Sequence, residues 1–350
     1  MITVDEIIQQ AVMVGTSDVH IVCGNPPIFR VSGQIERMGD TPLTDEDCTA
    51  IAKDLAGHHF EEFEHVGELD LAKNIAGERV RINVFKQQGH YSAALRILSN
   101  KIPPLATLGL PKIVYEFPNY KKGIVLVTGE TGSGKSTTLA ALLNEINHTR
   151  KGHIITLEDP IEYVYTSDKC VINQREVGKD TDSYASGLRA ILREDPDIIL
   201  IGEMRDMDTI ETALTAAETG HLVFATLHTN SAVDSVDRII NVFPADRQQQ
   251  IRMELGSTLR AVLSQQLLPR MLKGGRVLAC ESMVSTPAIQ NQIREGKTFQ
   301  MHSTMMSSGA EGCQTMDTCL INLAMEGKIS PQVAVDAAKD REFVKKKIMM

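Results

Sequence analysis

The 350-residue chain contains no tryptophan, and aromatic residues make up only 4% of it. No apolar run approaches the length of about 20 residues that a membrane-spanning helix needs. The first ten residues, MITVDEIIQQ, lack the basic and apolar regions of a secretory signal. The six cysteines form no C-x-x-C pair, so their spacing matches neither a zinc ribbon nor a dithiol redox motif. We therefore expect a cytoplasmic protein with reduced, mostly buried thiols.

Basic residues are also fewer than acidic residues. The chain has 36 basic against 45 acidic residues, a formal net charge of -9, and no lysine- or arginine-rich stripe interleaved with aromatics. Nucleic acid is therefore not expected as a main partner. The hydrophobic content of 42% is enough for ordinary buried cores, and the length predicts two or three domains.

Four prolines in IPPLATLGLPKIVYEFP divide the chain, because each disfavours a helix at the preceding residue. We predict a linker at residues 102–118. Residues 1–101 mix a helical segment, VDEIIQQAVM, and a capped helix near Thr44 with short strand-like runs, which predicts a small α+β domain. Residues 119–280 are predicted to form βα units, in which apolar strand-like runs alternate with helical stretches. From about residue 245 the pattern is mostly helical, including RQQQIRMELGSTLRAVLSQQLL. After a short predicted strand, VLACESM, residues 281–350 are predicted to form a helical C-terminal subdomain.

The βα region contains four apolar runs without alternation, which is typical of parallel strands buried on both faces. Each run turns polar at its C-terminal end: GIVLVTG (123–129), HIITLEDP (153–160), DIILIGE (197–203) and HLVFATLH (221–228). In an open parallel sheet these ends line one edge, where ligands bind. The fold class is therefore predicted as α/β.

The stretch GETGSGKST, residues 129–137, satisfies the phosphate-loop pattern G-x-x-x-x-G-K-[ST] between a buried strand and a helix. Its glycines let successive N–H groups turn toward a phosphate at a helix N-terminus. Lys135 is predicted to reach the β- and γ-phosphates, and Ser136 to ligate Mg²⁺. The predicted nucleotide contacts are Gly129, Thr131, Gly132, Ser133, Gly134, Lys135, Ser136 and Thr137.

Hydrolysis needs a carboxylate that activates water. Glu203 ends an apolar strand, which is typical of a Walker B carboxylate and predicts a second Mg²⁺ contact, although a solvated strand-end glutamate would look similar. In LEDPIEY, Glu162 and two further carboxylates follow another strand end, as they would in an ordinary surface loop. His228 follows a third strand and is placed to donate to a γ-phosphate oxygen, with a structural histidine as the alternative.

Phosphoryl transfer commonly uses an arginine, and none lies near the lysine loop in sequence. Arg79 and Arg81 alternate on ERVRINVF, so they share one face of a strand, and Arg96 lies in the next strand. These three form a candidate basic face, with an ordinary solvated face as the alternative.

Four motifs in order, GETGSGKST, LEDPIEY, LREDPDIILIGEMRD and TAAETGHLVFATLHTNSA, resemble the Walker A, Asp box, Walker B and His box of secretion and pilus ATPases. Within that superfamily the chain most resembles the PilT-type retraction ATPases of type IV pili. The resemblance implies a homohexamer in which a PAS-like N-terminal domain precedes a RecA-like ATPase domain. It also implies that Glu162 or Glu203 activates water, that His228 contacts the γ-phosphate, and that Arg79, Arg81 and Arg96 reach a neighbouring subunit's nucleotide.

The implied function is an ATP- and Mg²⁺-dependent motor for pilus retraction and twitching motility. It would act at the cytoplasmic face of the inner membrane, attached only through partners such as the pilus platform protein. The chain has neither the extra N-terminal domain nor the four-cysteine insertion of assembly and type II secretion relatives, which favours retraction. The segment AIQNQIRE departs from the AIRNLIRE of that branch and leaves an accessory pilus, secretion or DNA-uptake ATPase as an alternative. A low-turnover nucleotide switch is a further alternative, and the chain lacks an N-K-x-D guanine motif.

Overall fold

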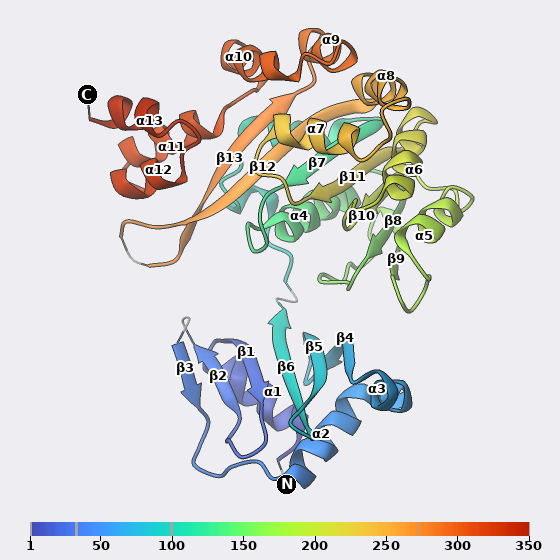
Figure 1. Ribbon diagram of the computed structural model, residues 1–350, viewed down its shortest axis with the longest axis vertical. Coiled ribbons are helices and arrows are strands. Elements are labelled where there is room, and N and C mark those ends of the chain that lie inside the picture. The colour runs from blue at the N-terminus through green and yellow to red at the C-terminus, as the bar shows by residue number, and fades with distance from the viewer. Residues whose placement is uncertain (1, 32–33, 99–100, 273, 350) are drawn as a thin grey trace. The chain divides into compact units, whose positions relative to one another are not determined.

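The computed structural model describes residues 2–31, 34–98, 101–272 and 274–349, which divide into two compact units (Figure 1). Unit 1 comprises Met1–Ile102 together with Pro160–Val164. Unit 2 comprises Pro103–Asp159 together with Tyr165–Met350. The short segment of residues 160–164 therefore belongs with unit 1, although the chain on both sides of it belongs to unit 2.

Unit 1 is built on a six-stranded antiparallel sheet with the order β3-β2-β1-β6-β5-β4. Its helices contribute to the same apolar core as the sheet, with Ile7, Ile8 and Leu55 almost fully buried beside Ile82 and Leu95. This arrangement confirms the predicted α+β organisation of the N-terminal region. The elements are α1 (Val4–Met13), β1 (Thr16–Ile21), β2 (Ile28–Val31), β3 (Gln34–Arg37), α2 (Asp45–Ala56), η1 (Gly57–His59), α3 (Phe60–Val66), β4 (Glu68–Ile75), β5 (Glu78–Gln87) and β6 (His90–Leu98).

Unit 2 contains a seven-stranded sheet with the order β13-β12-β7-β11-β10-β8-β9, parallel except for the pairing of β12 with β13. The sheet confirms the predicted α/β fold. Its strands are β7 (Gly123–Thr128), β8 (Gly152–Glu158), β9 (Cys170–Glu176), β10 (Ile198–Ile201), β11 (Leu222–Leu227), β12 (Leu259–Pro269) and β13 (Arg276–Val284). The helices before β12 are η2 (Leu105–Thr107), η3 (Lys112–Asn119), α4 (Lys135–Thr149), α5 (Tyr184–Ile191), α6 (Met207–Glu218), α7 (Ala232–Asn241) and α8 (Gln248–Thr258).

The central strands of unit 2 are buried on both faces, as their continuous apolar sequences predict. All six residues of β7 and all six of β11 are buried. Ile124 and Leu126 join a core with side chains of α5 to α8. Val125 and Val127 alternate with them and so face the other side of the sheet, while α4 also packs against β7, β8 and β9. Helices on both faces leave the strand ends as the place where polar groups gather.

The segment after α8 corrects one prediction. LRAVLSQQLL was predicted to continue a helix, but Leu259–Pro269 form β12, which pairs with β7 on one side and β13 on the other. Backbone pairing with two neighbours, together with burial of Leu259 and Leu263, overrides the helical spacing of the apolar residues. The strand VLACESM was correctly predicted within β13, and the two strands form the long hairpin in Figure 1.

The proline-rich segment predicted as a linker at residues 102–118 is not extended chain. From Pro103 onward it belongs to unit 2, where it forms η2 and η3 and packs against α4. Leu105, Val114 and Phe117 are buried there. The prolines still have the predicted effect, because the segment forms short 3-10 turns rather than an α-helix. The domain limits 1–101, 119–280 and 281–350 remain predictions.

The C-terminal region is helical, as predicted, and follows the β12–β13 hairpin. It contains α9 (Pro287–Arg294), η4 (Thr298–Gln300), α10 (Met301–Ser307), η5 (Gly309–Glu311), α11 (Met316–Met325), α12 (Pro331–Ala337) and α13 (Arg341–Ile348).

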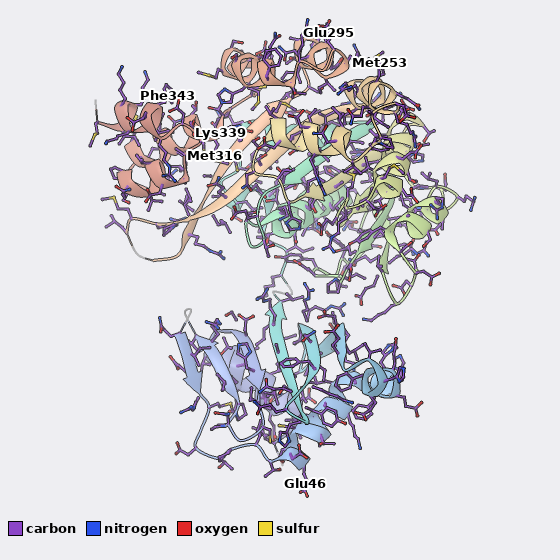
Figure 2. All side chains as sticks on the ribbon, in the orientation of Figure 1. Glu46, Met253, Glu295, Met316, Lys339 and Phe343 are labelled. Carbon is purple, nitrogen blue, oxygen red and sulfur yellow. The ribbon has the colours of Figure 1, made fainter. Side chains whose placement is uncertain are left out.

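Glu281 of β13 joins this region to α7: its carboxylate accepts hydrogen bonds from the backbone N–H of Ala232, at 2.7 Å, and of Met316, at 3.2 Å. Burial raises the pKa of Glu281, which these hydrogen bonds and the nearby Lys339 partly oppose. Figure 2 labels Met316 and Lys339 close together in this region.

Candidate nucleotide site

The predicted phosphate loop runs from the end of β7 to the start of α4, within unit 2. Gly129, Gly132 and Gly134 have φ values of 140°, 80° and 92°, which side-chain-bearing residues rarely adopt. At Gly129 a Cβ atom would also collide with the Gln265 carbonyl oxygen of β12 and lie 2.6 Å from Ser133 Oγ. The glycines are therefore required by the backbone conformation itself, and they place α4's first N–H groups at the loop.

Lys135 is buried and lies across this loop. Its ammonium group donates to the carbonyl oxygens of Gly129, at 2.7 Å, and Glu130, at 2.9 Å. Ser133 Oγ is also buried and has no hydrogen-bond partner among the described residues. Ser136 is exposed at the first turn of α4. An ammonium group, a buried hydroxyl and helix N–H groups around one loop are the donors that a phosphate chain requires.

Glu203 and His228 follow β10 and β11, and they lie beside the loop as the strand-end pattern predicts. Glu203 pairs with His228, with 3.3 Å between Oε1 and Nε2. His228 Nδ1 in turn lies 3.5 Å from Lys135 Nζ. Because Lys135 has only donors, a hydrogen bond at this distance requires that His228 accept at Nδ1 and donate from Nε2. This tautomer connects Lys135 to Glu203 through one imidazole ring.

Arg205 is a contact of Glu203 that the sequence reasoning missed. Its Nη2 lies 2.7 Å from Glu203 Oε2, and its side chain is 70% exposed, against 17% for Glu203. Burial acts to raise the pKa of Glu203, but the hydrogen bond from Arg205 and the nearby His228 outweigh it and hold the pKa below its usual value. Glu203 is therefore a carboxylate that stays ionised although it is mostly shielded from water.

Two further carboxylates, Glu158 and Asp159, lie at the C-terminal end of β8. Glu158 accepts hydrogen bonds from Thr156 Oγ1, at 2.6 Å, and Gln174 Nε2, at 3.2 Å. Burial raises the pKa of Tyr184, and the charges of Asp159, Glu158 and Glu203 raise it further. These three carboxylates are therefore near enough to Tyr184 of α5 to affect its ionisation, and α5 was not predicted separately from the sequence.

Glu162, Arg79, Arg81 and Arg96 belong to unit 1, whereas the phosphate loop belongs to unit 2. Within unit 1, Arg81 lies directly opposite Arg96 in the β5–β6 register, so both lie on one face of the sheet with Arg79. Arg96 pairs with Asp18 at 2.8 Å, and Arg79 Nε donates to the Ile161 carbonyl oxygen at 3.3 Å. The shared arginine face exists, and Arg79 holds the segment that carries Glu162. The predicted catalytic roles of these residues remain predictions.

A second missed arginine approaches the loop from the opposite edge of the sheet. Arg276, at the start of β13, donates a long hydrogen bond of 3.5 Å from Nη1 to the Gly132 carbonyl oxygen. On β12, Ser264 Oγ lies 2.8 Å from Thr128 Oγ1, and Gln265 Nε2 donates to Thr138 Oγ1 at 2.8 Å. The contacts of Ser264 and Gln265 come from the strand predicted as a helix, and Arg276 lies on the strand paired with it, so no signal in the sequence placed them at the site.

The model of a known protein family, "Type II/IV secretion system protein", matches residues 74–337, which is more than half of the chain. The chain belongs to this family. The match begins within β4 and includes the phosphate loop, Glu203, His228 and the arginines of β5 and β6. The strand ends that carry Glu203 and His228 therefore lie inside the region that the family shares.

Relatives within the family are similar over nearly the whole chain. The "Type IV pilus retractation ATPase PilT" of Pseudomonas aeruginosa is 46% identical over 93% of this chain and 95% of its own length. The "Twitching motility protein" of Neisseria gonorrhoeae is 43% identical over 90% of this chain and 85% of its own. A solved structure described as the pilus retraction motor PilT with bound ADP has a TM-score of 0.93 at 46% identity, over 99% of this chain and 100% of that one.

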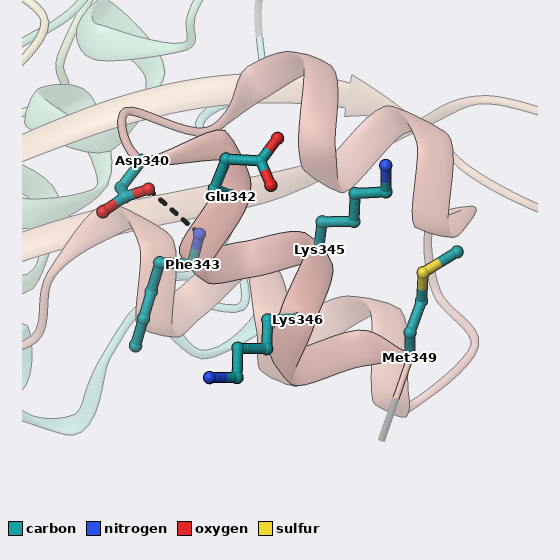
Figure 3. A pocket seen from close by; sticks show the side chains of 6 residues that line it. All are labelled: Asp340, Glu342, Phe343, Lys345, Lys346 and Met349. Atoms are coloured by element: carbon teal, nitrogen blue, oxygen red, sulfur yellow. Dashed lines mark hydrogen bonds between the residues drawn. The ribbon is translucent and has the colours of Figure 1, made fainter.

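A hollow of about 520 Å³ lies elsewhere in unit 2, beside α13 (Figure 3). It is lined by Asp340, Glu342, Phe343, Lys345, Lys346 and Met349, which belong to α13 and its two caps and include no glycine. It is therefore not a second nucleotide site of the phosphate-loop kind. In the part of the chain that the structure describes, no helix has the length and apolar character to cross a membrane.

Proposed function

We propose that this protein is an ATPase that powers the retraction of type IV pili and thereby twitching motility. The observation that supports this most directly is the connected set Lys135, His228 and Glu203 at the phosphate loop. It joins a phosphate-binding cation to an ionised, shielded carboxylate, which are the two parts that hydrolysis requires and that a binding loop alone lacks.

In this proposal the loop Gly129–Thr137 binds the phosphates of ATP, and Glu203 orients and deprotonates the attacking water. Lys135 exchanges its loop carbonyl partners for phosphate oxygens, and His228 turns its imidazole toward the γ-phosphate. Ser136 and Glu203 offer the oxygen ligands that Mg²⁺ prefers, and Ser136 is exposed at the helix N-terminus. When bound, Mg²⁺ would neutralise charge on the phosphates. Glu162 is the alternative base.

The assembly remains a proposal of the same kind. We expect a homohexamer in which Arg79, Arg81 and Arg96 of one subunit reach the nucleotide of the next. Their shared face on β5 and β6 supports this, because three arginines on one face can meet a polyphosphate together. We expect the ring to work at the cytoplasmic face of the inner membrane, bound to a pilus platform protein rather than to lipid.

A deletion strain tests the proposed output. Loss of twitching, with surface pili retained or more abundant, is expected if the protein drives retraction. Loss of the pili themselves would contradict it. The controls are complementation with the intact gene and with Lys135→Ala, which keeps the protein but removes the phosphate-binding cation.

An accessory pilus ATPase is a second candidate, favoured by the sequence of α9. Gln290 and Gln292 stand there, and both are built into the fold: Gln290 Nε2 donates to the Ser285 carbonyl oxygen at 3.1 Å, and Gln292 Nε2 donates to Thr304 Oγ1 at 2.8 Å. For an accessory motor the deletion strain keeps twitching but retracts with less force, which a pilus force measurement detects.

A further inference from the structure

A cysteine, an aspartate and a histidine from three separate elements meet at one end of unit 1. Cys23 follows β1, Asp45 is the first residue of α2, and His90 is the first residue of β6. One ligand atom of each lies within 4.8 Å of the others. Figure 2 labels Glu46, the residue next to Asp45, at the end of unit 1 where β6 begins. None of these residues takes part in the proposed ATPase site.

We infer that Cys23, Asp45 and His90 form a zinc site, with a water molecule as the fourth ligand. Thiolate, imidazole and carboxylate are the three ligand types that Zn²⁺ binds in proteins, and three protein ligands with one open position form a recognised tetrahedral arrangement. Ligand atoms around such an ion are about 3.5 Å apart. Asp45 and His90 are exposed and Cys23 is half-buried, so their side chains have room to rotate toward that spacing.

The fold holds the backbone of these residues in place. The antiparallel register pairs Ile21 with Ala93, so the chain just after β1 lies beside the start of β6. Gly24 N–H donates to the Leu43 carbonyl oxygen, and Leu43 N–H donates to that of Asn25, both at 2.9 Å. These bonds fasten the Cys23 turn to the segment that leads into α2. A bound ion would therefore join three elements that are already neighbours.

The pairing of His90 with Asp45 shows where the ion would sit. His90 Nδ1 and Asp45 Oδ1 are 2.6 Å apart and share a proton, and both side chains are about half exposed. Zinc would replace that proton and use the Cys23 thiolate as its third ligand. Metal binding would thus release protons, because all three ligands bind in their deprotonated forms.

A second thiol, Cys48, lies next to Cys23 but does not fit the ligand set. Its side chain is 1% exposed. It belongs to the apolar core of unit 1 together with Ile51 and Leu55, so the thiol is held inside the protein. Cys48 is therefore a matched control: a thiol beside the site that we expect not to bind the metal.

Cobalt is a suitable probe because it gives a near-ultraviolet charge-transfer band only when a thiolate binds it. The full-length protein, free of nucleotide, stripped with a chelator and kept reduced, is titrated with Co²⁺ and then with Zn²⁺. We expect the charge-transfer band to saturate at one Co²⁺ per chain and to be lost when Zn²⁺ displaces the cobalt. Zn²⁺ should also raise the unfolding temperature of the reduced protein.

Variants identify the ligands. Cys23→Ser should lose the charge-transfer band, and His90→Gln should weaken Co²⁺ affinity by about 100-fold or more, since loss of even an outer partner costs about 10- to 100-fold. Cys48→Ala and Cys319→Ser should bind like the unaltered protein. No charge-transfer band in the unaltered protein, a band that survives Cys23→Ser, or a band that disappears in Cys48→Ala would each overturn the assignment. Because His90 is exposed, its variant reports on binding even if Cys23→Ser folds poorly.

Discussion

Replacing Glu203 with glutamine is the most direct test of the catalytic assignment. The change keeps the size of the side chain but removes the charge that pairs with Arg205 at 2.7 Å and with His228 at 3.3 Å. It leaves the phosphate loop itself unaltered. The substitution therefore separates the activation of water from the binding of nucleotide.

The expected loss follows from the role of a general base, which contributes about 10²- to 10⁴-fold in rate. This corresponds to about 3 to 5 kcal/mol of barrier, which should appear entirely in kcat. Affinity for ATP should remain, because Lys135 and the loop N–H groups bind it. The fold should also remain, since Arg205 is mostly exposed and an ion pair of that kind stabilises a protein by at most about 1 kcal/mol.

The assay is steady-state phosphate release with Mg-ATP, combined with direct nucleotide binding. Glu158→Gln is the matched control, because Glu158 also ends a strand of the sheet but hydrogen-bonds neutral partners, Thr156 and Gln174. If Glu203→Gln hydrolyses ATP at the unaltered rate, our assignment of the base is wrong. Loss in Glu162→Gln with retention in Glu203→Gln would transfer the role to Glu162.

The pH dependence gives the same hypothesis a second readout. The pKa of Glu203 is lowered from 4.5, so the carboxylate is charged across neutral pH, and its contribution to kcat is lost only as pH falls through that lowered pKa. In Arg205→Ala the hydrogen bond that lowers the pKa is removed while burial still acts to raise it. The acidic limb of the kcat profile should therefore move to higher pH. A limb that stays in place would show that Glu203 is not the titrating group.

Two further predictions concern stability. Gly129→Ala should lower the melting temperature and weaken ATP binding. An alanine at a φ of 140°, in contact with the Gln265 carbonyl oxygen, would strain the loop by about 1 to 3 kcal/mol. A variant that melts and binds like the unaltered protein would contradict this. Glu281→Gln should destabilise unit 2 by about 1 to 3 kcal/mol in urea unfolding, because an amide oxygen replaces a carboxylate that accepts two helix N–H groups. The pKa of Glu281 is raised in the folded protein, so the folded state holds its proton more tightly than the unfolded state does. The unfolding free energy should therefore fall as pH rises from about 4.5 through the folded pKa. This slope should be absent in Glu281→Gln.

The parts of the site that the sequence predicted are local. GETGSGKST follows its strand and starts its helix without interruption, so spacing alone placed Lys135 at the loop. Glu203 and His228 were predictable because each directly follows an apolar run, and parallel strands bring such ends together. These predictions needed no knowledge of which strand lies next to which.

The parts that were missed depend on strand order. LRAVLSQQLLP has apolar spacing compatible with a helix, and only its pairing between β7 and β13 makes it a strand. That error hid Gln265 directly, and it hid the pairing with β12 that brings Arg276 of β13 to the sheet; their contacts with Thr138 and Gly132 span 127 and 144 residues. Tyr184 was missed for the same reason, since its neighbours Glu158 and Glu203 come from two other strand ends. Periodicity does not carry such information.

Unit 2 itself contains two arginines at the candidate site: Arg205 pairs with Glu203, and Arg276 donates to the Gly132 carbonyl oxygen of the loop. The site therefore does not lack an arginine of its own. The proposal now rests on the shared face of Arg79, Arg81 and Arg96 rather than on a missing cation. Mixed assemblies distinguish the two sources. Lys135→Ala subunits carry intact arginines, so mixing them with Arg81→Ala subunits should restore ATPase activity if Arg81 acts across the interface.

Mixing Lys135→Ala with Glu203→Gln subunits should restore none, because Lys135 and Glu203 belong to the same unit and every site would then carry one defect. Rescue in both mixtures would mean that Glu203 acts across the interface as well. Rescue in neither, with assemblies formed normally, would mean that Arg81 acts within its own subunit. The ATPase activity of the mixtures therefore identifies whether Arg81 acts across the interface, although each variant is inactive alone.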